Sequence, residues 1–263
     1  MFFNVSEPYT CTKVDERALQ AWEQDGVLKI TGLISQEWSI NLRNRVIAIL
    51  GSEPESLQAW TNLEPSLLKP IGLDKRCVPL EIESVKEAVD SLIGKEWEYP
   101  NTGGGWFANA PRQLERQHLP KIELAPRGTW HWDGRPDLHP GGLWLFTPVT
   151  EMLPHSGGTW LVAGSARMVL DFYASLLPEK QGKPTNLVKK WFTDDHEWFK
   201  VLNSGSGETL NQTNHAGDAV RLLNVSGKLG DVVLMKNFTI HSAPEYIGPG
   251  ARVCHVVVAS ATP

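Results

Sequence analysis

A histidine and an aspartate stand two residues apart in "WHWDG" (residues 130–134), and both side chains can do chemistry. In a strand, residues i and i+2 point to the same face, so His131 and Asp133 project together, with Trp130 and Trp132 on the other side. Such a pair can be a buried, hydrogen-bonded pair that only stabilises the fold, or it can be half of a metal site. The pair alone does not decide between them.

A second histidine lies in the C-terminal segment "GDVVLMKNFTIHSAPEYIGPGARVCHVVV" (230–258). A predicted strand from Asp231 runs into a turn that carries His241, and the strand after it carries Arg252. Two imidazoles and one carboxylate, with three coordination positions left open, form the facial triad of non-haem Fe(II) sites. An arginine on the following strand can bind a dicarboxylic co-substrate through a bidentate pair. These residues favour a metal site at His131, Asp133 and His241, with Arg252 beside it, but at this point a buried pair of His131 and Asp133 stays open.

The elements that must position these residues change type along the chain. Residues 1–96 read as helical, with amphipathic segments that begin at capping residues and end at glycines. Residues 97–260 read as short strands separated by turn residues, which is typical of a sandwich, jelly roll or barrel. A helix is expected at 166–178. The polar residues 179–217 read as a long excursion, in which Trp191–Trp198 is a lid candidate by position. We expect one domain over residues 1–263.

The composition narrows the class of protein. The chain has 263 residues, is 41% hydrophobic and 21% charged, and carries a formal net charge of −5. An acidic balance gives no attraction to phosphate backbones, so nucleic acid is not an expected partner. We find no apolar run of membrane-spanning length and no signal peptide. The three cysteines are far apart and lack CxxC spacing, which favours reduced thiols in the cytoplasm and no thiolate zinc site.

Several stretches together carry a resemblance to a known family. They are the entry segment "AWEQDGVLKITGLISQEW", the "WHWDG" motif, "SGGTWLVAGSAR", and "LGDVVLMKNFTIHSA" followed by "ARV" eleven residues after His241. In this order they resemble the phytanoyl-CoA dioxygenase-like branch of the Fe(II)/2-oxoglutarate-dependent oxygenases. The resemblance runs from about residue 18 to residue 258.

The resemblance implies a mainly β fold with flanking helices: a double-stranded β-helix, that is, a jelly-roll, cupin-like barrel. His131, Asp133 and His241 would hold Fe(II), and Arg252 would pair with the distal carboxylate of 2-oxoglutarate. Thr159 stands where some members of the family place a hydroxyl that also contacts this co-substrate. With O2, the expected reaction oxidises a substrate and releases succinate and CO2. Asp133 disfavours halogenation, because related halogenases lack this carboxylate.

The sequence departs from the family pattern at two positions near the site. Ala166 replaces a histidine that often follows "GS", and Ala243 replaces a serine found two residues after the distal histidine. Neither change touches a predicted metal ligand. The second leaves Arg252 as the main predicted contact of the co-substrate.

The expected substrate is a small organic molecule, such as a natural product or an amino-acid-type metabolite. The Gly-rich stretch "NTGGGWFANAPR" (101–112) lacks the Lys-Ser/Thr of a phosphate-binding loop and is interpreted as a hairpin or flap near the pocket. Its Trp106, Asn109 and Arg112 are candidate substrate contacts, as is Arg135. The remaining histidines have no partner pattern, and we expect surface or capping roles for them: His118, His139, His155, His196, His215 and His255.

Two other functions stay open at the level of sequence. One is a barrel that has lost catalysis and serves as a binding module, which the complete triad and arginine argue against. The other is a metal-dependent cupin-type enzyme that does not use 2-oxoglutarate. Activity that is indifferent to 2-oxoglutarate would favour the latter.

Overall fold

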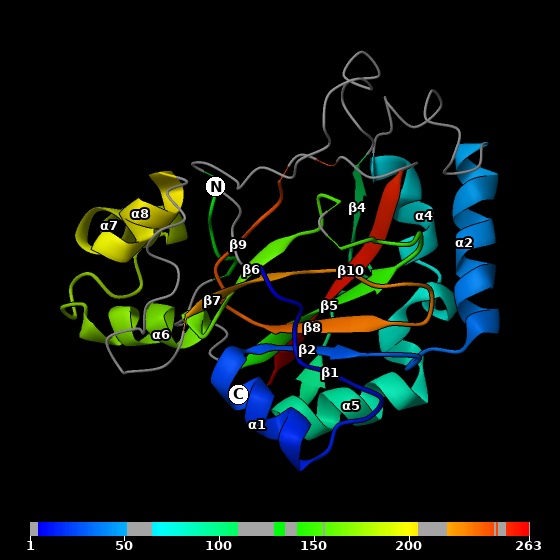
Figure 1. The fold of residues 1–263 in the computed structure, drawn as a ribbon, viewed down its shortest axis with the longest axis horizontal. Coiled ribbons are helices and arrows are strands. Elements are labelled where there is room, and N and C mark those ends of the chain that lie inside the picture. The colour runs from blue at the N-terminus through cyan, green and yellow to red at the C-terminus, as the bar shows by residue number, and fades with distance from the viewer. Residues whose placement is uncertain are drawn as a thin grey trace.

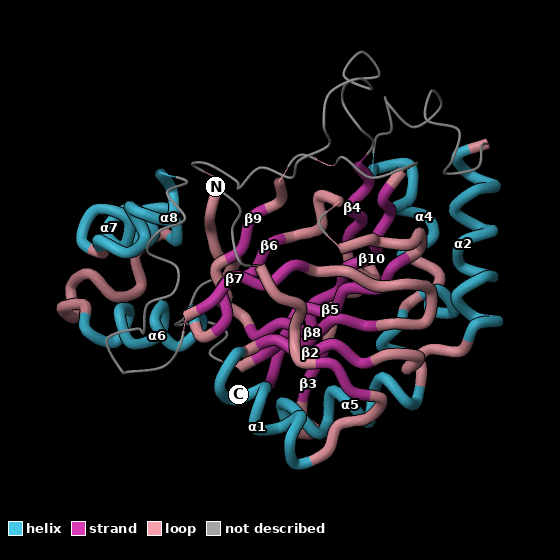
Figure 2. The backbone as a smooth tube through the Cα atoms, viewed as in Figure 1, coloured by secondary structure: helices cyan, strands magenta, loops and turns pink. Residues whose placement is uncertain are grey.

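The computed structural model of the chain describes most of its residues. The described ranges are 5–51, 65–109, 129–134, 141–154, 156–204, 220–244, 246 and 251–262. Two β-sheets occupy the middle of the molecule, and helices surround them (Figure 2).

The larger sheet contains most of the strands, and all of its neighbours are antiparallel except β1 and β2. Its order is β1 (Thr10–Cys11), β2 (Val27–Ile30), β8 (Val232–Lys236), β5 (Gly142–Pro148), β10 (Arg252–Ala261) and β3 (Trp97–Glu98), and β4 (Gly105–Asn109) also pairs with β10. The smaller sheet has the order β7 (Arg221–Asn224), β6 (Trp160–Ala163) and β9 (His241–Ser242).

The chain passes back and forth between the sheets: β5, β8 and β10 belong to the larger sheet, whereas β6, β7 and β9 belong to the smaller one. Apolar side chains from both sheets meet in one buried cluster, with Phe146, Val233 and Cys254 from one side and Leu161 and Leu223 from the other. This cluster is the interior of the barrel. The predicted double-stranded β-helix is confirmed.

Helices from the first third of the chain cover the outer face of the larger sheet (Figure 1). Helices α1 (Glu16–Asp25) and α5 (Glu83–Ile93) pack on one part of it, and α2 (Gln36–Leu50) and α4 (Lys69–Gly72) pack on another. Short 3-10 turns link them: η1 (Pro65–Leu68), η2 (Lys75–Cys77) and η3 (Pro79–Glu81). The predicted caps are confirmed, because Asp15 accepts a hydrogen bond from the Ala18 amide at 2.9 Å and Gly26 ends α1 at φ 72°.

Three further helices cover the smaller sheet: α6 (Ser165–Ser175), α7 (Thr185–Asp195) and α8 (Glu197–Ser204). The predicted excursion of residues 179–217 lies between β6 and β7, but part of it forms the helices α7 and α8 rather than a loop. Within α7, Val188 and Phe192 are four residues apart and are both buried against the sheet. This helical spacing lies within a polar segment whose overall composition favours loops. The proposed lid, Trp191–Trp198, spans the end of α7 and the start of α8, and its movement stays a prediction.

The structure differs from three local predictions. The segment around "TWHWD" forms a single β-bridge at His131 rather than a strand. The stretch interpreted as a hairpin or flap contains β4, which pairs with β10 inside the larger sheet. His255 was expected at the surface or at a cap, but it is fully buried in β10, with its ring centroid 4.5 Å from that of Trp106.

None of the helices in the described ranges combines the length and the apolar character that a membrane crossing requires. The cysteines Cys11, Cys77 and Cys254 are free thiols. Burial raises the pKa of Cys254 to about 12, so this thiol stays protonated and unreactive at neutral pH.

Candidate metal centre

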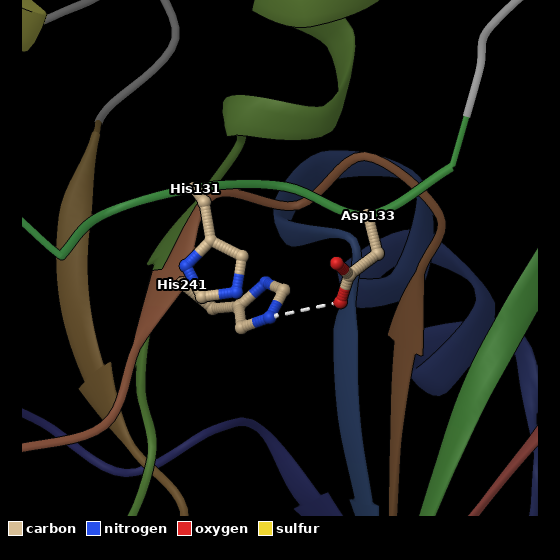
Figure 3. Close-up of side chains that lie close together, drawn as sticks. All are labelled: His131, Asp133 and His241. Atoms are coloured by element: carbon tan, nitrogen blue, oxygen red, sulfur yellow. Dashed lines mark ion pairs between the residues drawn. The ribbon is translucent and has the colours of Figure 1, made fainter. Parts of the chain in front are cut away.

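His131, Asp133 and His241 converge on one point (Figure 3). Each residue offers a nitrogen or carboxylate oxygen, and these atoms all lie within 4.8 Å of one another. A separation of this size is what three ligands of one ion require, since each ligand atom lies about 2 Å from a bound transition metal. The structure thus brings together the three residues that the sequence predicted as ligands.

The backbone explains why the two histidines meet although they are far apart in the sequence. His131 and His241 form an antiparallel bridge, in which each amide donates to the other residue's carbonyl, at 3.0 Å and 2.7 Å. Residues paired in this way place their side chains on the same face. The two ring centroids are 4.4 Å apart, and the rings are tilted by 53°. Asp133, two residues after His131, lies on the same side (Figure 3).

Hydrogen bonds to the backbone fix the tautomer of both rings. Nδ1 of His131 lies 2.8 Å from the carbonyl oxygen of Thr129, and Nδ1 of His241 lies 2.9 Å from that of Thr239. A carbonyl can only accept, so Nδ1 carries the proton in each ring. Neutral imidazoles held in this way present the lone pair of Nε2, which is how histidine binds a metal. The donor set therefore fits a divalent transition metal ion.

The carboxylate completes the electrostatics of the site. Asp133 Oδ2 lies 3.3 Å from His241 Nε2. The hydrogen bond from His241 lowers the pKa of Asp133 against the opposing effect of burial. Burial, together with the neighbouring His241, lowers the pKa of His131, which favours the neutral ring. Because Nδ1 of His241 already donates to Thr239, its Nε2 bonds Asp133 only when it also carries a proton. A metal ion takes the place of this proton.

Two tryptophans anchor the ligand segment from behind. Trp130 and Trp132 alternate with the ligands and are buried in the cluster that α6, α7 and α8 form with the smaller sheet. The ring of Trp132 contacts Phe192 of α7 edge-on, with centroids 5.3 Å apart. The segment is thus held in place although it lacks a strand ladder.

Arg252 begins β10 and is buried at 2% exposure. Its Nη1 donates to the carbonyl of Gly157 at 2.7 Å. The next residue, Val253, packs against α2 and α4 in a cluster outside the barrel, called here the outer cluster. Because side chains alternate along a strand, Arg252 lies on the opposite face, together with Cys254 of the barrel interior. Arg252 is therefore tied to the Gly-rich segment that leads into β6.

Thr159 follows that Gly-rich segment and is half-buried. Its carbonyl accepts from the Val225 amide at 2.8 Å. Two residues further on, Leu161 faces the barrel interior and pairs with His241 across β6 and β9. Thr159 directly precedes β6. In the sequence it stands midway between Gly157, the hydrogen-bond partner of Arg252, and Leu161, the register partner of His241.

The candidate substrate contacts differ in where they lie. Asn109 is directly opposite Arg252 in the register of β4 and β10. Trp106 is opposite His255 and is buried in the outer cluster beneath α2 and α4, so it points away from the barrel interior. Arg112 and Arg135 lie outside the described residues.

Two residues near the site were not predicted. Lys189 of α7 has its Nζ 5.5 Å from the ring centroid of Trp132. Tyr246 is buried, and burial raises its pKa. The nearby cation Arg252 lowers this pKa and so offsets part of the increase. The helical spacing in 185–195 was the signal that could have pointed to Lys189. No comparable pattern marks Tyr246.

Solved structures with this arrangement of elements are known. The non-heme alpha-ketoglutarate-dependent carbocyclase SnoK from nogalamycin biosynthesis matches with a TM-score of 0.55 at 14% identity, over 94% of this chain and 84% of that chain. EvdO2 from Micromonospora carbonacea var. aurantiaca matches with a TM-score of 0.53 at 15% identity, over 95% and 92%.

A third structure, EctD from S. alaskensis with 2-oxoglutarate and 5-hydroxyectoine, gives a TM-score of 0.52 at 17% identity, over 99% of this chain and 79% of that chain. This chain shares their fold. No protein-family model and no curated protein sequence matches it. At these identities the likeness establishes the barrel, and the chemistry has to be argued from the side chains.

Proposed function

We propose that the protein is an Fe(II)- and 2-oxoglutarate-dependent oxygenase, similar to the phytanoyl-CoA dioxygenase-like branch, that oxidises a small organic molecule. The observation that carries this proposal is the convergence of His131, Asp133 and His241, with both Nδ1 atoms bound to backbone carbonyls. Two neutral imidazoles and one carboxylate on one face are the donor set of non-haem Fe(II) oxygenases. When bound, iron with 2-oxoglutarate and O2 would supply an oxidant strong enough for a C–H bond, with release of succinate and CO2.

The chain's own residues have separable tasks in this proposal. His131, Asp133 and His241 hold the ion, and Thr129 and Thr239 orient the rings through their carbonyls. Arg252 binds the distal carboxylate of 2-oxoglutarate. Its burial supports this role, since a charge-assisted pair is stronger where water is excluded. Thr159 is the proposed hydroxyl contact of the same co-substrate.

The proposal is less specific about the substrate than about the metal and the co-substrate. SnoK is described as a carbocyclase, and EctD was solved with 5-hydroxyectoine, a small hydroxylated metabolite. We propose a substrate of similar kind, a natural product or amino-acid-type metabolite, with hydroxylation, desaturation, epimerisation or cyclisation as the outcome. Asn109 is the best-supported substrate contact, because it lies opposite Arg252. Arg112 and Arg135 stay candidates. We also propose a single domain and a cytoplasmic location, which the free cysteines support.

The test is anaerobic titration of the purified protein with Fe(II) and 2-oxoglutarate, followed by exposure to O2. We expect a metal-to-ligand charge-transfer band in the visible region and succinate above background. Metal binding without this band, and turnover indifferent to 2-oxoglutarate, would favour a cupin-type enzyme. Absence of both metal binding and succinate would favour a non-catalytic barrel.

A further inference from the structure

Helix α7 carries a lysine to the back of the metal-ligand segment. Lys189 is half-buried beside Val188, and its Nζ lies 5.5 Å from the ring centroid of Trp132, the residue between His131 and Asp133. Because Val188 and Phe192 hold α7 against the core, the lysine stem has a fixed starting point. An ammonium at this distance from an aromatic face is within range of a cation–π contact.

Among the described residues, no carboxylate lies within salt-bridge distance of the Nζ of Lys189, and Asp133 is the acidic group that acts on its charge. Burial lowers the pKa of Lys189, and Asp133 opposes this. The ammonium lies over the ring of Trp132, the residue between His131 and Asp133 in the sequence. Its charge therefore acts on the segment that carries two of the three ligands.

The two ligands that fill the site carry opposite charges. A divalent ion brings a charge of +2, and the 2-oxoglutarate dianion that binds after it brings −2. A fixed ammonium nearby repels the first ligand and attracts the second. Its effect on the two binding steps must therefore have opposite signs.

We propose that Lys189 couples co-substrate binding to metal binding: it weakens the hold of the site on the metal alone and strengthens the binding of 2-oxoglutarate to the metal-loaded site. This proposal rests on the proposed function, since it assumes that 2-oxoglutarate binds at this metal. Lys189 acts here through its charge, from its position over the ring of Trp132.

The experiment compares Lys189→Met with Lys190→Met, using Mn(II) as a redox-stable probe and 2-oxoglutarate as the second ligand. Methionine keeps an unbranched apolar stem over Trp132. Lys190, the next residue on α7, is exposed, so its substitution makes the same change in net charge away from Trp132. Calorimetry measures the Kd of Mn(II) for the metal-free protein and the Kd of 2-oxoglutarate for the Mn(II)-loaded protein.

For Lys189→Met we expect the Kd of Mn(II) to fall by about two- to fivefold and the Kd of 2-oxoglutarate to rise by a similar or smaller factor, the size seen for partly exposed charge pairs. Both changes should shrink with added salt. Lys190→Met and Lys189→Arg should match the wild type.

The outcomes separate the two proposals. If Lys189→Met weakens both ligands, or changes neither, the lysine has only a structural role and the coupling is refuted. A wild-type protein that binds Mn(II) but does not bind 2-oxoglutarate contradicts the proposed function itself, and the coupling falls with it. Opposite shifts in Lys189→Met alone support both.

Discussion

Asp133 is the ligand whose loss is most informative at the scale of single residues. It supplies the negative charge of the triad, and its side chain is 39% exposed, so it contributes little to the core. For Asp133→Ala we expect the metal affinity to fall by more than about 100-fold, because even changes behind the ligands cost about 10- to 100-fold. The free energy of unfolding should stay near that of the wild type. Metal titration and urea unfolding measure the two quantities.

A matched control for this variant is Asp171→Ala, which removes an exposed carboxylate from α6. It should leave metal affinity unchanged. If Asp133→Ala unfolds the protein while the remaining folded fraction still binds metal, then His131 and Asp133 form a stabilising pair rather than half of a metal site.

Arg252 allows a test of the co-substrate side. In Arg252→Lys a charge remains, but the planar fork that binds a carboxylate through two hydrogen bonds is lost. We expect the KM for 2-oxoglutarate to rise by about tenfold, the loss of roughly one charge-assisted hydrogen bond, with a much smaller change in kcat. Succinate release against 2-oxoglutarate concentration measures both. Arg167→Lys, on the exposed side of α6, is the control. An unchanged KM would remove Arg252 from the co-substrate site.

At the scale of elements, Phe192 joins the outer helices to the ligand segment. It is fully buried, and its ring contacts Trp132, Phe172 and Phe199 edge-on, at centroid distances of 5.3, 5.1 and 5.2 Å. We expect Phe192→Ala to lower the free energy of unfolding by about 3–5 kcal/mol, the usual cost of removing a buried phenylalanine.

Because Trp132 lies between two ligands, Phe192→Ala should also weaken metal binding in the folded protein. Guanidinium unfolding and metal titration at a temperature well below the transition separate the two effects. Leu177→Ala, at a residue that is 56% exposed, should change stability by less than about 0.5 kcal/mol. Unaltered metal affinity in Phe192→Ala would mean that the bridge between His131 and His241 alone holds the ligand segment.

The elements differ in how far their sequences predict them. The strands of the barrel and the capped helices α1 and α2 were predictable, because each follows one periodicity between clear start and stop residues. Helices α7 and α8 were missed, since their apolar residues are spaced within a segment rich in charged and polar side chains. The ligand segment was predictable as a pair on one face but not as a single bridge, because its anchoring by Trp130 and Trp132 is tertiary.

At the scale of the whole molecule, the site depends on closure of the barrel. His131 reaches His241 only because β9 pairs with β6, and Arg252 reaches Gly157 only because β10 faces the smaller sheet. The sequence order of the ligands and the arginine therefore predicted the site only through the family resemblance. Composition and spacing alone did not decide between a metal site and a buried pair of His131 and Asp133. Lys189 could not be predicted without the position of α7.

Fully buried His255 makes the stability of the whole fold depend on pH. Burial lowers the pKa of this ring from 6.5 to about 4. Between these values the unfolded chain binds a proton that the folded protein does not, so folding is favoured less as the pH falls. The contribution of neutral His255 to stability is complete above pH 6.5 and is lost as the pH falls towards 4, by up to about 3 kcal/mol.

We therefore expect His255→Phe to flatten the dependence of unfolding free energy on pH between about 6.5 and 4. Phenylalanine can keep the packing against Trp106, whose ring centroid lies 4.5 Å from that of His255, but it cannot take up a proton. Urea unfolding of the metal-free protein at a series of pH values measures the slope. His131, whose pKa is also lowered, adds to the slope in both proteins, so their difference reports His255. Parallel curves for the two proteins would show that the buried ring is already protonated, or hydrated, in the folded state.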